Sequence, residues 1–242
     1  MIRHARLAVA LTGAGFSTPS GIPDFRTPSE GLWEHTDPME VASLTTFHRQ
    51  PERFFDWFRP LSQAIHDAAP NPAHEALAML EHAGFIKAVI TQNIDGLHQQ
   101  AGSRNVLELH GSVRSLSCLD CSTHHSPEPF LPAYLSTGAL PHCPECGAVL
   151  KPDIVFFEEM LPQGTWQKAA QFCSTCDVLL VVGSSLEVAP ASNLPRYALE
   201  NDARAIIVNR TPTYLDRKAV FVFRENLEEV IPAMASLLLD HE

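Results

Sequence analysis

The amino-acid sequence predicts an α/β fold in which a parallel sheet carries helices on both faces and is joined to a smaller second lobe. Apolar runs of strand length recur along the 242 residues, and they are continuous rather than alternating, which indicates strands covered on both faces. Helical patterns lie between these runs, and alternation of strand with helix predicts a parallel sheet. Two stretches break this alternation, and we assign them to the second lobe.

The expected strands lie at residues 7–11, 85–90, 178–182 and 205–208. The clearest helix is expected at residues 72–81, between the first two strands. Asn71 can cap its N-terminus, and Pro72 suits its first position because no N–H donor is needed there. Gly84 follows near the expected end of the helix, as is typical after a C-terminus.

Two inserts are expected, at residues 27–70 and 116–150. The first contains prolines at positions 28, 38, 51 and 60 and an aromatic cluster of Phe54, Phe55, Trp57 and Phe58. The larger lobe then comprises residues 1–26, 71–115 and 151–242. Because a cleft between lobes is the usual place for a ligand, function is expected where the inserts leave the sheet.

Composition excludes several classes of protein. The formal net charge of −11 argues against gripping nucleic-acid phosphates, because that uses Lys and Arg clusters and the sequence shows none. No stretch approaches the roughly 20 apolar residues of a membrane span. The apolar run at residues 7–11 is shorter than the roughly 7 to 15 residues of a signal-peptide core. With cysteines in zinc spacing, this predicts a cytoplasmic protein without a membrane partner.

Four cysteines form two C-x2-C pairs 21 residues apart: Cys118, Cys121, Cys143 and Cys146. Two thiolates separated by two residues can bind one ion from a tight knuckle, and a second knuckle completes a tetrahedron around Zn²⁺. Another pair, Cys173 and Cys176, has no second pair to complete it. We interpret these two as small buried residues at a helix-to-strand junction, with a redox pair as the alternative.

A glycine-rich turn, Thr12-Gly13-Ala14-Gly15-Phe16-Ser17, directly follows the first expected strand. Glycines there let backbone N–H groups approach a pyrophosphate closely. Thr18 replaces the third glycine of the dinucleotide fingerprint, and no acidic residue closes a second strand about 20 residues later. The turn favours a dinucleotide but departs from the dehydrogenase form of the fold, and a plain strand-to-helix turn is the alternative.

Polar residues also stand where the other expected strands end: Gln92, Asn93 and Asp95, then Gly183, Ser184 and Ser185, then Asn209. The carboxyl ends of parallel strands meet at one edge of a sheet, so these residues are expected to converge on one crevice. Taken singly, Asn93 and Asp95 are equally typical of turn residues that cap the next helix.

Several motifs in one order resemble the sirtuins, the NAD-dependent protein-lysine deacylases: GAGFSTPSGIPDFR (13–26), TQNIDGLHQQAG (91–102), ELHGS (108–112), the four cysteines, KPDIVFF (151–157), GSSLEVAPASNLP (183–195) and VNRTPT (208–213). The resemblance runs nearly end to end. It implies a Rossmann-like lobe, a small lobe made of a zinc ribbon and a helical module, and NAD consumed as a co-substrate. The implied reaction deacetylates lysine in acyl-lysine proteins and releases nicotinamide and O-acyl-ADP-ribose.

On matching positions the resemblance implies two catalytic residues, His110 as general base and Asn93 to position ribose and water. Imidazole titrates near neutral pH, which suits removing a proton from a ribose hydroxyl. The implied NAD-binding residues are Gly13, Ala14, Gly15, Ser17, Asp24, Phe25, Arg26, Gln92, Asn93, Asp95, Gly183, Ser184, Ser185 and Asn209. The implied substrate-binding residues are Val155, Phe156, Phe157 and Val188, on two edges between which an acyl-lysine peptide inserts as an extra strand.

Departures from the family sharpen these expectations. Glu158 stands where glycine is usual, which removes the freedom to adopt positive φ and adds a charge beside the peptide groove. The step Thr27-Pro28 stands where a glycine is common. Sirtuins that remove succinyl groups carry a Tyr-x-x-Arg pair on the insert helix, and the matching positions here are Phe58 and Leu61. Neither can pair with a carboxylate, so acetyl and other uncharged acyl groups are expected to be preferred over succinyl.

Other functions are compatible with parts of the same pattern. An NAD-dependent protein mono-ADP-ribosyltransferase would use much of the same pocket and transfer ADP-ribose to protein. A non-catalytic NAD sensor would keep the glycines but needs no base, which His110 disfavours. A nucleic-acid-binding zinc ribbon would need a basic face, and the sequence shows none.

Overall fold

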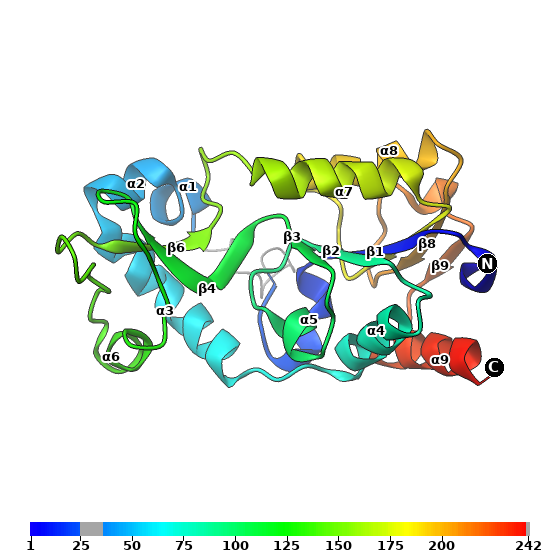
Figure 1. The fold of residues 1–242 in the computed structure, drawn as a ribbon, viewed down its shortest axis with the longest axis horizontal. Helices are drawn as coiled ribbons and strands as arrows, with labels where there is room; N and C mark the ends of the chain where they lie inside the picture. Colours follow the sequence, from blue (N-terminus) through cyan, green and yellow to red (C-terminus); the bar gives the residue numbers. More distant parts are fainter. Residues whose placement is uncertain (25–35, 241–242) are drawn as a thin grey trace.

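The computed structural model describes residues 1–24 and 36–240, so the predictions for Phe25, Arg26 and Thr27-Pro28 lie outside the described residues. Figure 1 shows two parts along the long axis: a sheet flanked by helices, with both chain ends, and a smaller group of helices around a second sheet. The strands are β1 Ala8–Thr12, β2 Ala88–Thr91, β3 Val106–Glu108, β4 Gly111–Cys118, β5 His124–His125, β6 Leu150–Ile154, β7 Val178–Val182, β8 Arg204–Val208 and β9 Phe221–Phe223. The α-helices are α1 Pro38–Val41, α2 Leu44–Arg49, α3 Pro51–Asp67, α4 Pro72–His82, α5 Leu97–Gln100, α6 Leu131–Thr137, α7 Gln163–Thr175, α8 Leu194–Leu199 and α9 Leu227–Leu239, and the 3-10 helices are η1 Ile2–His4, η2 Ala14–Phe16, η3 Thr18–Ser20, η4 Ala191–Asn193 and η5 Asp216–Lys218.

In the described residues the large sheet has the order β3-β2-β1-β7-β8-β9, and every pairing in it is parallel. The predicted strands correspond to β1, β2, β7 and β8, so the parallel α/β prediction is confirmed. The sequence did not predict β3 and β9. Each is only three residues long, and β9 is an edge strand whose Phe221 is half exposed, so neither produces a buried apolar run.

The two faces of the sheet are covered by different helices. Val9 and Leu11 of β1 lie in one apolar cluster with residues of α7 and α8, whereas Ala8 and Ala10 lie in another with residues of α4 and α9. This follows from the alternation of side chains along a strand. Figure 1 shows α7 and α8 on one side of the sheet and α4 and α9 on the other.

Helix α4 begins as the sequence predicts. The Asn71 side chain accepts hydrogen bonds from the backbone N–H groups of Ala73 and His74, Pro72 takes the first position, and Gly84 has φ +80° beyond the end. A side-chain cap of this kind satisfies amides that the first helical turn leaves without partners.

The smaller part joins the helices α1, α2, α3 and α6 to the antiparallel sheet β5-β4-β6. Its aromatic core includes Phe47, Phe54 and Phe58, and the Tyr134 hydroxyl donates to the carbonyl of Phe55. The sheet extends beyond the predicted insert of 116–150, since β4 begins at Gly111 and β6 ends at Ile154.

Cys173 and Cys176 lie where α7 ends and β7 follows, and both are buried. Burial raises the pKa of Cys176 to about 11, so this thiol is protonated near neutral pH. Both findings fit the interpretation as small buried residues rather than a reactive pair. Among the described residues, no helix has the length and apolar content that crossing a membrane requires.

Candidate active site and metal centre

One cavity of about 1280 Å³ opens where β1, β2, β7 and β8 end and reaches the smaller part of the molecule. Every predicted catalytic, nucleotide-binding or substrate-binding residue within the described part of the chain lines it: Gly13, Ala14, Gly15, Ser17, Asp24, Gln92, Asn93, Asp95, His110, Val155, Phe156, Phe157, Gly183, Ser184, Ser185, Val188 and Asn209. The structure thus brings these residues together from distant parts of the sequence. Phe25 and Arg26 lie outside the described residues.

The turn after β1 and the turn after β7 contact each other at the floor of this cavity. The Gly15 amide donates to the carbonyl of Gly183 at 2.9 Å. Gly183 has φ +60°, and a Cβ at this position would lie 2.4 Å from the backbone nitrogen of Phe16. Glycine is therefore required here for both conformation and space.

A buried hydrogen-bonded group links the turn after β1 to the turn after β2. The Asn93 amide Nδ2 donates to Ser17 Oγ at 3.0 Å, and Ser17 Oγ donates to Asp95 Oδ2 at 2.7 Å. Asp95 also accepts from the amide of Leu97, the first residue of α5, and it lines the cavity. Burial raises the pKa of Asp95 above its usual value, and these hydrogen bonds oppose the shift.

The imidazole of His110 has a defined tautomer. Its Nδ1 lies 2.9 Å from the carbonyl oxygen of Gln92, and because a carbonyl only accepts, the proton is on Nδ1. Nε2 then carries the lone pair. Burial lowers the pKa of His110, with the Gln92 hydrogen bond opposing, so the ring is neutral at pH 7 and can accept a proton.

Gly111 follows His110 with φ +75°, and a Cβ there would lie 1.9 Å from the Asp153 carbonyl. Only glycine allows β4 and β6 to meet so closely behind the histidine. The His110 carbonyl in turn accepts from the Val155 amide at 2.8 Å. The candidate base and the predicted peptide edge are therefore joined through one backbone contact.

The predicted peptide edge is already engaged with its own chain. The Phe157 amide donates to Ala42 and its carbonyl accepts from Leu44, while the Phe156 amide donates to Glu159 Oε2 at 2.7 Å. With the Val155 bond to His110, all three amides of residues 155–157 are used within the molecule.

The sequence did not single out Lys151 as a site residue, yet it anchors this edge. Its buried Nζ donates to the Ile154 carbonyl at 2.7 Å, lies 2.9 Å from Glu159 Oε2 and sits 4.1 Å from the centre of the Phe156 ring. Burial lowers the pKa of Lys151, and the Glu159 ion pair opposes this. Lysine is normally exposed, so the sequence gives no signal of this burial apart from the place of Lys151 as the first residue of the KPDIVFF motif.

Glu158 adopts φ +73°, although positive φ at this position was expected only for glycine. Its carboxylate accepts from the Thr45 amide at 2.8 Å near the start of α2, and this hydrogen bond lowers the pKa of Glu158. The expectation that Glu158 loses positive φ is therefore wrong. The contact to Thr45 accounts for a non-glycine residue holding this backbone conformation.

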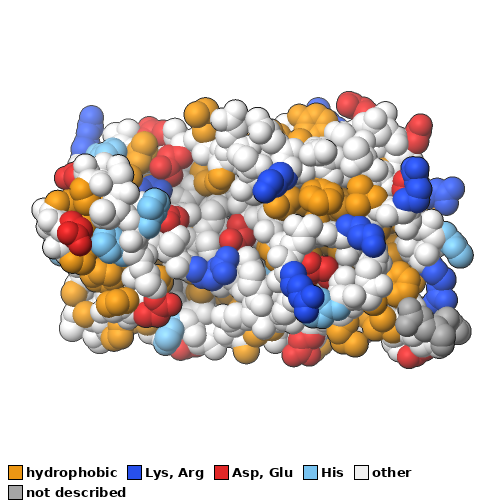
Figure 2. Space-filling view, in the orientation of Figure 1, with side chains coloured by type: hydrophobic (Ala, Val, Ile, Leu, Met, Phe, Trp, Pro, Cys, Tyr) orange, Lys and Arg blue, Asp and Glu red, His pale blue; other side chains and the backbone are white. Residues whose placement is uncertain are grey.

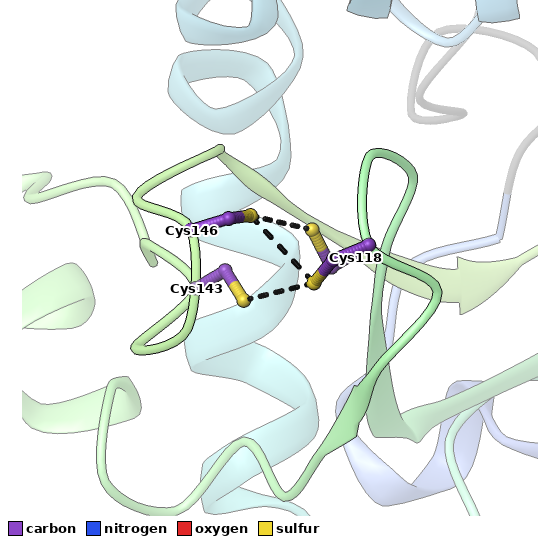
Figure 3. Close-up of side chains that lie close together, drawn as sticks. Cys118, Cys143 and Cys146 are labelled. Carbon is purple, nitrogen blue, oxygen red and sulfur yellow. Dashed lines mark hydrogen bonds between the residues drawn. The ribbon is translucent and has the colours of Figure 1, made fainter.

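The four cysteines of the two C-x2-C pairs form one cluster, with all four sulfur atoms within 4.8 Å of one another. Cys118 and Cys146 Sγ are 3.4 Å apart, and Cys121 Sγ is 3.6 Å from those of Cys143 and Cys146. Figure 3 shows the sulfurs of two separate loops pointing at each other. A Zn–S distance of about 2.3 Å gives tetrahedral edges of about 3.8 Å, so the cluster fits a zinc ion.

Fold and site together define a two-lobed α/β protein with its cavity at the ends of parallel strands and a four-cysteine ribbon beside it. The chain belongs to the Sir2 family, whose sequence model matches residues 13–190.

It is 42% identical over 238 residues to NAD-dependent protein deacetylase 1 of Pyrobaculum aerophilum, covering 98% of this chain and 92% of that protein. Identity to NAD-dependent protein deacylase 2 of Archaeoglobus fulgidus is 48% over 217 residues, covering 89% and 85%.

Solved structures agree with this assignment. One reported for the mechanism and regulation of Sir2 enzymes superposes with a TM-score of 0.91 at 44% identity, covering 100% of this chain and 96% of that one. A Sir2 variant with a deacetylated p53 peptide and 3'-O-acetyl ADP-ribose gives 0.90 at 38%, covering 98% and 94%. Sir2Tm bound to a propionylated peptide gives 0.86 at 37%, also covering 98% and 94%.

Proposed function

We propose that this chain is an NAD-dependent protein-lysine deacetylase that also accepts other uncharged acyl groups. The observation that carries the proposal is His110, a neutral imidazole with a free Nε2 lone pair in the same cavity as the strand-end polar residues. The similar deacetylases and acyl-peptide complexes support it, and a cavity of about 1280 Å³ accommodates a dinucleotide together with an acyl-lysine.

In the proposed reaction the bond between nicotinamide and ribose breaks, and the acyl oxygen of the lysine bonds to the ribose carbon. His110 removes a proton from the adjacent ribose hydroxyl, whose oxygen then attacks the acyl carbon. The lysine amine leaves with the proton that His110 took up. Water then adds to the acyl carbon, and the bond from that carbon to the oxygen on the first ribose carbon breaks, which gives O-acyl-ADP-ribose. A positioned base of this kind contributes about 10²- to 10⁴-fold to the rate.

The buried group of Asn93, Ser17 and Asp95 would hold the nicotinamide-ribose end, because its hydrogen bonds fix these side chains before any ligand arrives. Gln92 Nε2 donates to Ser184 Oγ at 2.9 Å. This hydrogen bond fixes these two side chains, which also line the cavity. Asn209, after β8, would meet the adenosine half.

An acyl-lysine peptide would enter between residues 155–157 and Val188. Since the three amides of residues 155–157 are engaged, added-strand pairing has to use carbonyl groups of this edge or backbone beyond Phe157. Main-chain pairing of this kind gives affinity with little demand on peptide sequence.

Preference for uncharged acyl groups rests on Phe58 and Leu61, which line the cavity and are buried. A succinyl carboxylate beside them would lose hydration without gaining a partner. Acetyl-lysine peptides should therefore turn over faster than succinyl-lysine peptides, and equal or faster succinyl turnover contradicts the preference. The double variant Phe58→Tyr/Leu61→Arg should gain succinyl turnover, with Leu61→Met as the matched uncharged control.

The cysteine cluster would hold Zn²⁺ through Cys118, Cys121, Cys143 and Cys146. Four thiolate ligands leave no open position on the ion, so its chemistry is structural.

Mass spectrometry of an acetyl-lysine peptide with and without NAD tests the proposal. Loss of the acetyl group only with NAD is expected. ADP-ribose attached to the protein acceptor, without deacetylation, would instead identify a mono-ADP-ribosyltransferase.

A further inference from the structure

Two buried histidines lie beneath the cavity without lining it. His74 of α4 and His98 of α5 have relative exposures of 0% and 1%. Their ring centres are 4.8 Å apart, and each lies within 5 Å of the Phe16 ring in the glycine-rich turn. Neither histidine has a role in the deacylation proposed above.

A chain of hydrogen bonds connects His98 to Asn93. His98 Nε2 lies 2.9 Å from Thr12 Oγ1, which donates to Thr91 Oγ1 at 2.8 Å. The Thr91 hydroxyl oxygen accepts from the backbone amide of Asn93 at 3.1 Å. The path thus crosses from α5 through the last residues of β1 and β2 to the turn that presents Asn93.

Hydrogen-bond directions fix the tautomers. The Thr12 proton goes to Thr91, so the contact with His98 requires an N–H at Nε2, which leaves the lone pair on Nδ1. His74 Nδ1 accepts from the Asn71 amide at 3.3 Å, so its proton is on Nε2. Burial lowers the pKa of His74 to about 4 and that of His98 well below its usual value, which keeps both rings neutral.

The two remaining ring nitrogens are complementary. In the described part of the chain, His74 Nε2 and His98 Nδ1 are buried without a hydrogen-bond partner. By the tautomers above, the first is a donor and the second an acceptor. Buried polar atoms are normally satisfied, and one buried water that accepts from His74 Nε2 and donates to His98 Nδ1 would satisfy both.

We propose that His98 is a positioning residue for Asn93, acting through Thr12 and Thr91 in the tautomer that its contact with Thr12 requires. The role rests on the proposed function, since Asn93 would hold the ribose of NAD. In this arrangement the floor of the cavity is rigid before the nucleotide binds, and loss of the His98 donor frees the Asn93 turn. His98 touches neither substrate nor base.

Nitrogen-15 NMR of the histidine rings in the wild-type protein tests the tautomers without any assay of activity. The expected result is an Nε2–H tautomer for both His74 and His98 across neutral pH. A proton on His98 Nδ1 would reverse the hydrogen-bond chain and overturn the proposal.

Kinetics of His98→Phe test the positioning role, because phenylalanine keeps the ring and removes both nitrogens. We expect kcat/KM for NAD to fall at least tenfold with the peptide KM unchanged, and His98→Gln, which restores an N–H donor, to recover most of it. His82→Phe, an exposed histidine of α4, should match the wild type. Unchanged NAD kinetics in a folded His98→Phe variant would overturn the role.

If His98→Phe does not fold, Thr12→Val breaks the same path and should show the same NAD defect.

Calorimetry of NAD binding separates this role from the proposed function. If the wild type binds NAD but never deacetylates, only the proposed function fails, and His98→Phe should still bind NAD more weakly. If wild type and His98→Phe bind NAD equally and both deacetylate, only the positioning role fails.

Discussion

The strand-end floor and the cysteine ribbon are organised by different forces. At the floor, Asn93, Ser17 and Asp95 bond to one another and to backbone groups. In the ribbon, sulfur atoms lie 3.4–3.6 Å from one another, and the Thr123 hydroxyl lies 3.1 Å from the sulfur of Cys121. Satisfied hydrogen bonds hold the first region without a ligand, whereas four converging thiols hold the second only when an ion replaces their protons.

The two regions should therefore respond differently to substitution. At the floor, small displacements of the side chains should lower activity while the fold stays intact. The ribbon should lose its fold outright when one ligand is removed, and it should affect the reaction only indirectly. Figure 2 shows acidic and basic side chains scattered over the visible face, so neither region stands out by surface charge on this side.

The largest expected effect is in the ribbon. Cys143→Ala should release the metal and unfold the smaller part of the molecule, because structural zinc sites have apparent binding free energies of about 10–16 kcal/mol. Metal analysis measures the zinc that stays bound, and circular dichroism measures the loss of folded structure. Cys173→Ala is the matched control, since Cys173 is buried outside the cluster, and it should retain one zinc per chain. A stable, fully active Cys143→Ala protein would show that the ribbon needs no ion.

Next in size is the loss of the base. His110→Ala should lower deacetylation by about 10²- to 10⁴-fold while thermal unfolding stays close to wild type. An exposed histidine of α2, changed as His48→Ala, supplies the comparison. Near wild-type turnover without His110 would assign the proton transfer to another group.

A smaller effect is expected on stability against pH. His74 has its pKa lowered by burial from 6.5 to about 4, so between these values the unfolded chain binds a proton that the folded chain does not. The contribution of His74 to the free energy of unfolding is therefore fully present above pH 6.5. It is lost as the pH drops toward 4, and the loss is about 3 kcal/mol in total. His98 acts in the same direction.

Urea unfolding at pH 7 and pH 5 measures this loss. His74→Phe should be less stable at pH 7, because it gives up the capping contact with Asn71, yet it should lose less on acidification than the wild type. An identical pH dependence would show that His74 is not the titrating group.

The smallest effect is expected at the link between the two regions. Lys151→Met removes the amine that holds the Ile154 carbonyl and Glu159, so the peptide KM should rise about tenfold, or about 1.4 kcal/mol. The KM for NAD should stay within about twofold. Lys87→Met, an exposed lysine before β2, should change neither. Equal increases in both KM values would mean that Lys151 supports the fold rather than the peptide edge.

Local patterns predicted the strands and the cysteine cluster because the signals are local. The run at residues 178–182 is continuous and apolar, and it forms β7 with the same bounds. Two C-x2-C pairs need only tight turns to present their sulfurs. The strand-end residues were found from their positions after expected strands, whereas the role of His110 came from a motif that resembles a family. Their common cavity follows from the parallel sheet.

Contacts between distant segments could not be predicted in this way. Nothing in the sequence indicates that Gln92 fixes the His110 tautomer, or that Lys151 is buried beside Glu159. Positive φ at Glu158 depends on the Thr45 amide, 113 residues away. Each of these arises only when separate elements of the chain pack together, so periodicity and propensity leave no trace of it.

The most direct test of the central claim is the product balance of one reaction containing acetyl-lysine peptide, NAD and the wild-type protein. Nicotinamide, deacetylated peptide and O-acetyl-ADP-ribose should form in equal amounts, because one base in one cavity links their formation. Deacetylated peptide appearing without NAD, or nicotinamide released with no acetyl transfer to ADP-ribose, would contradict the account.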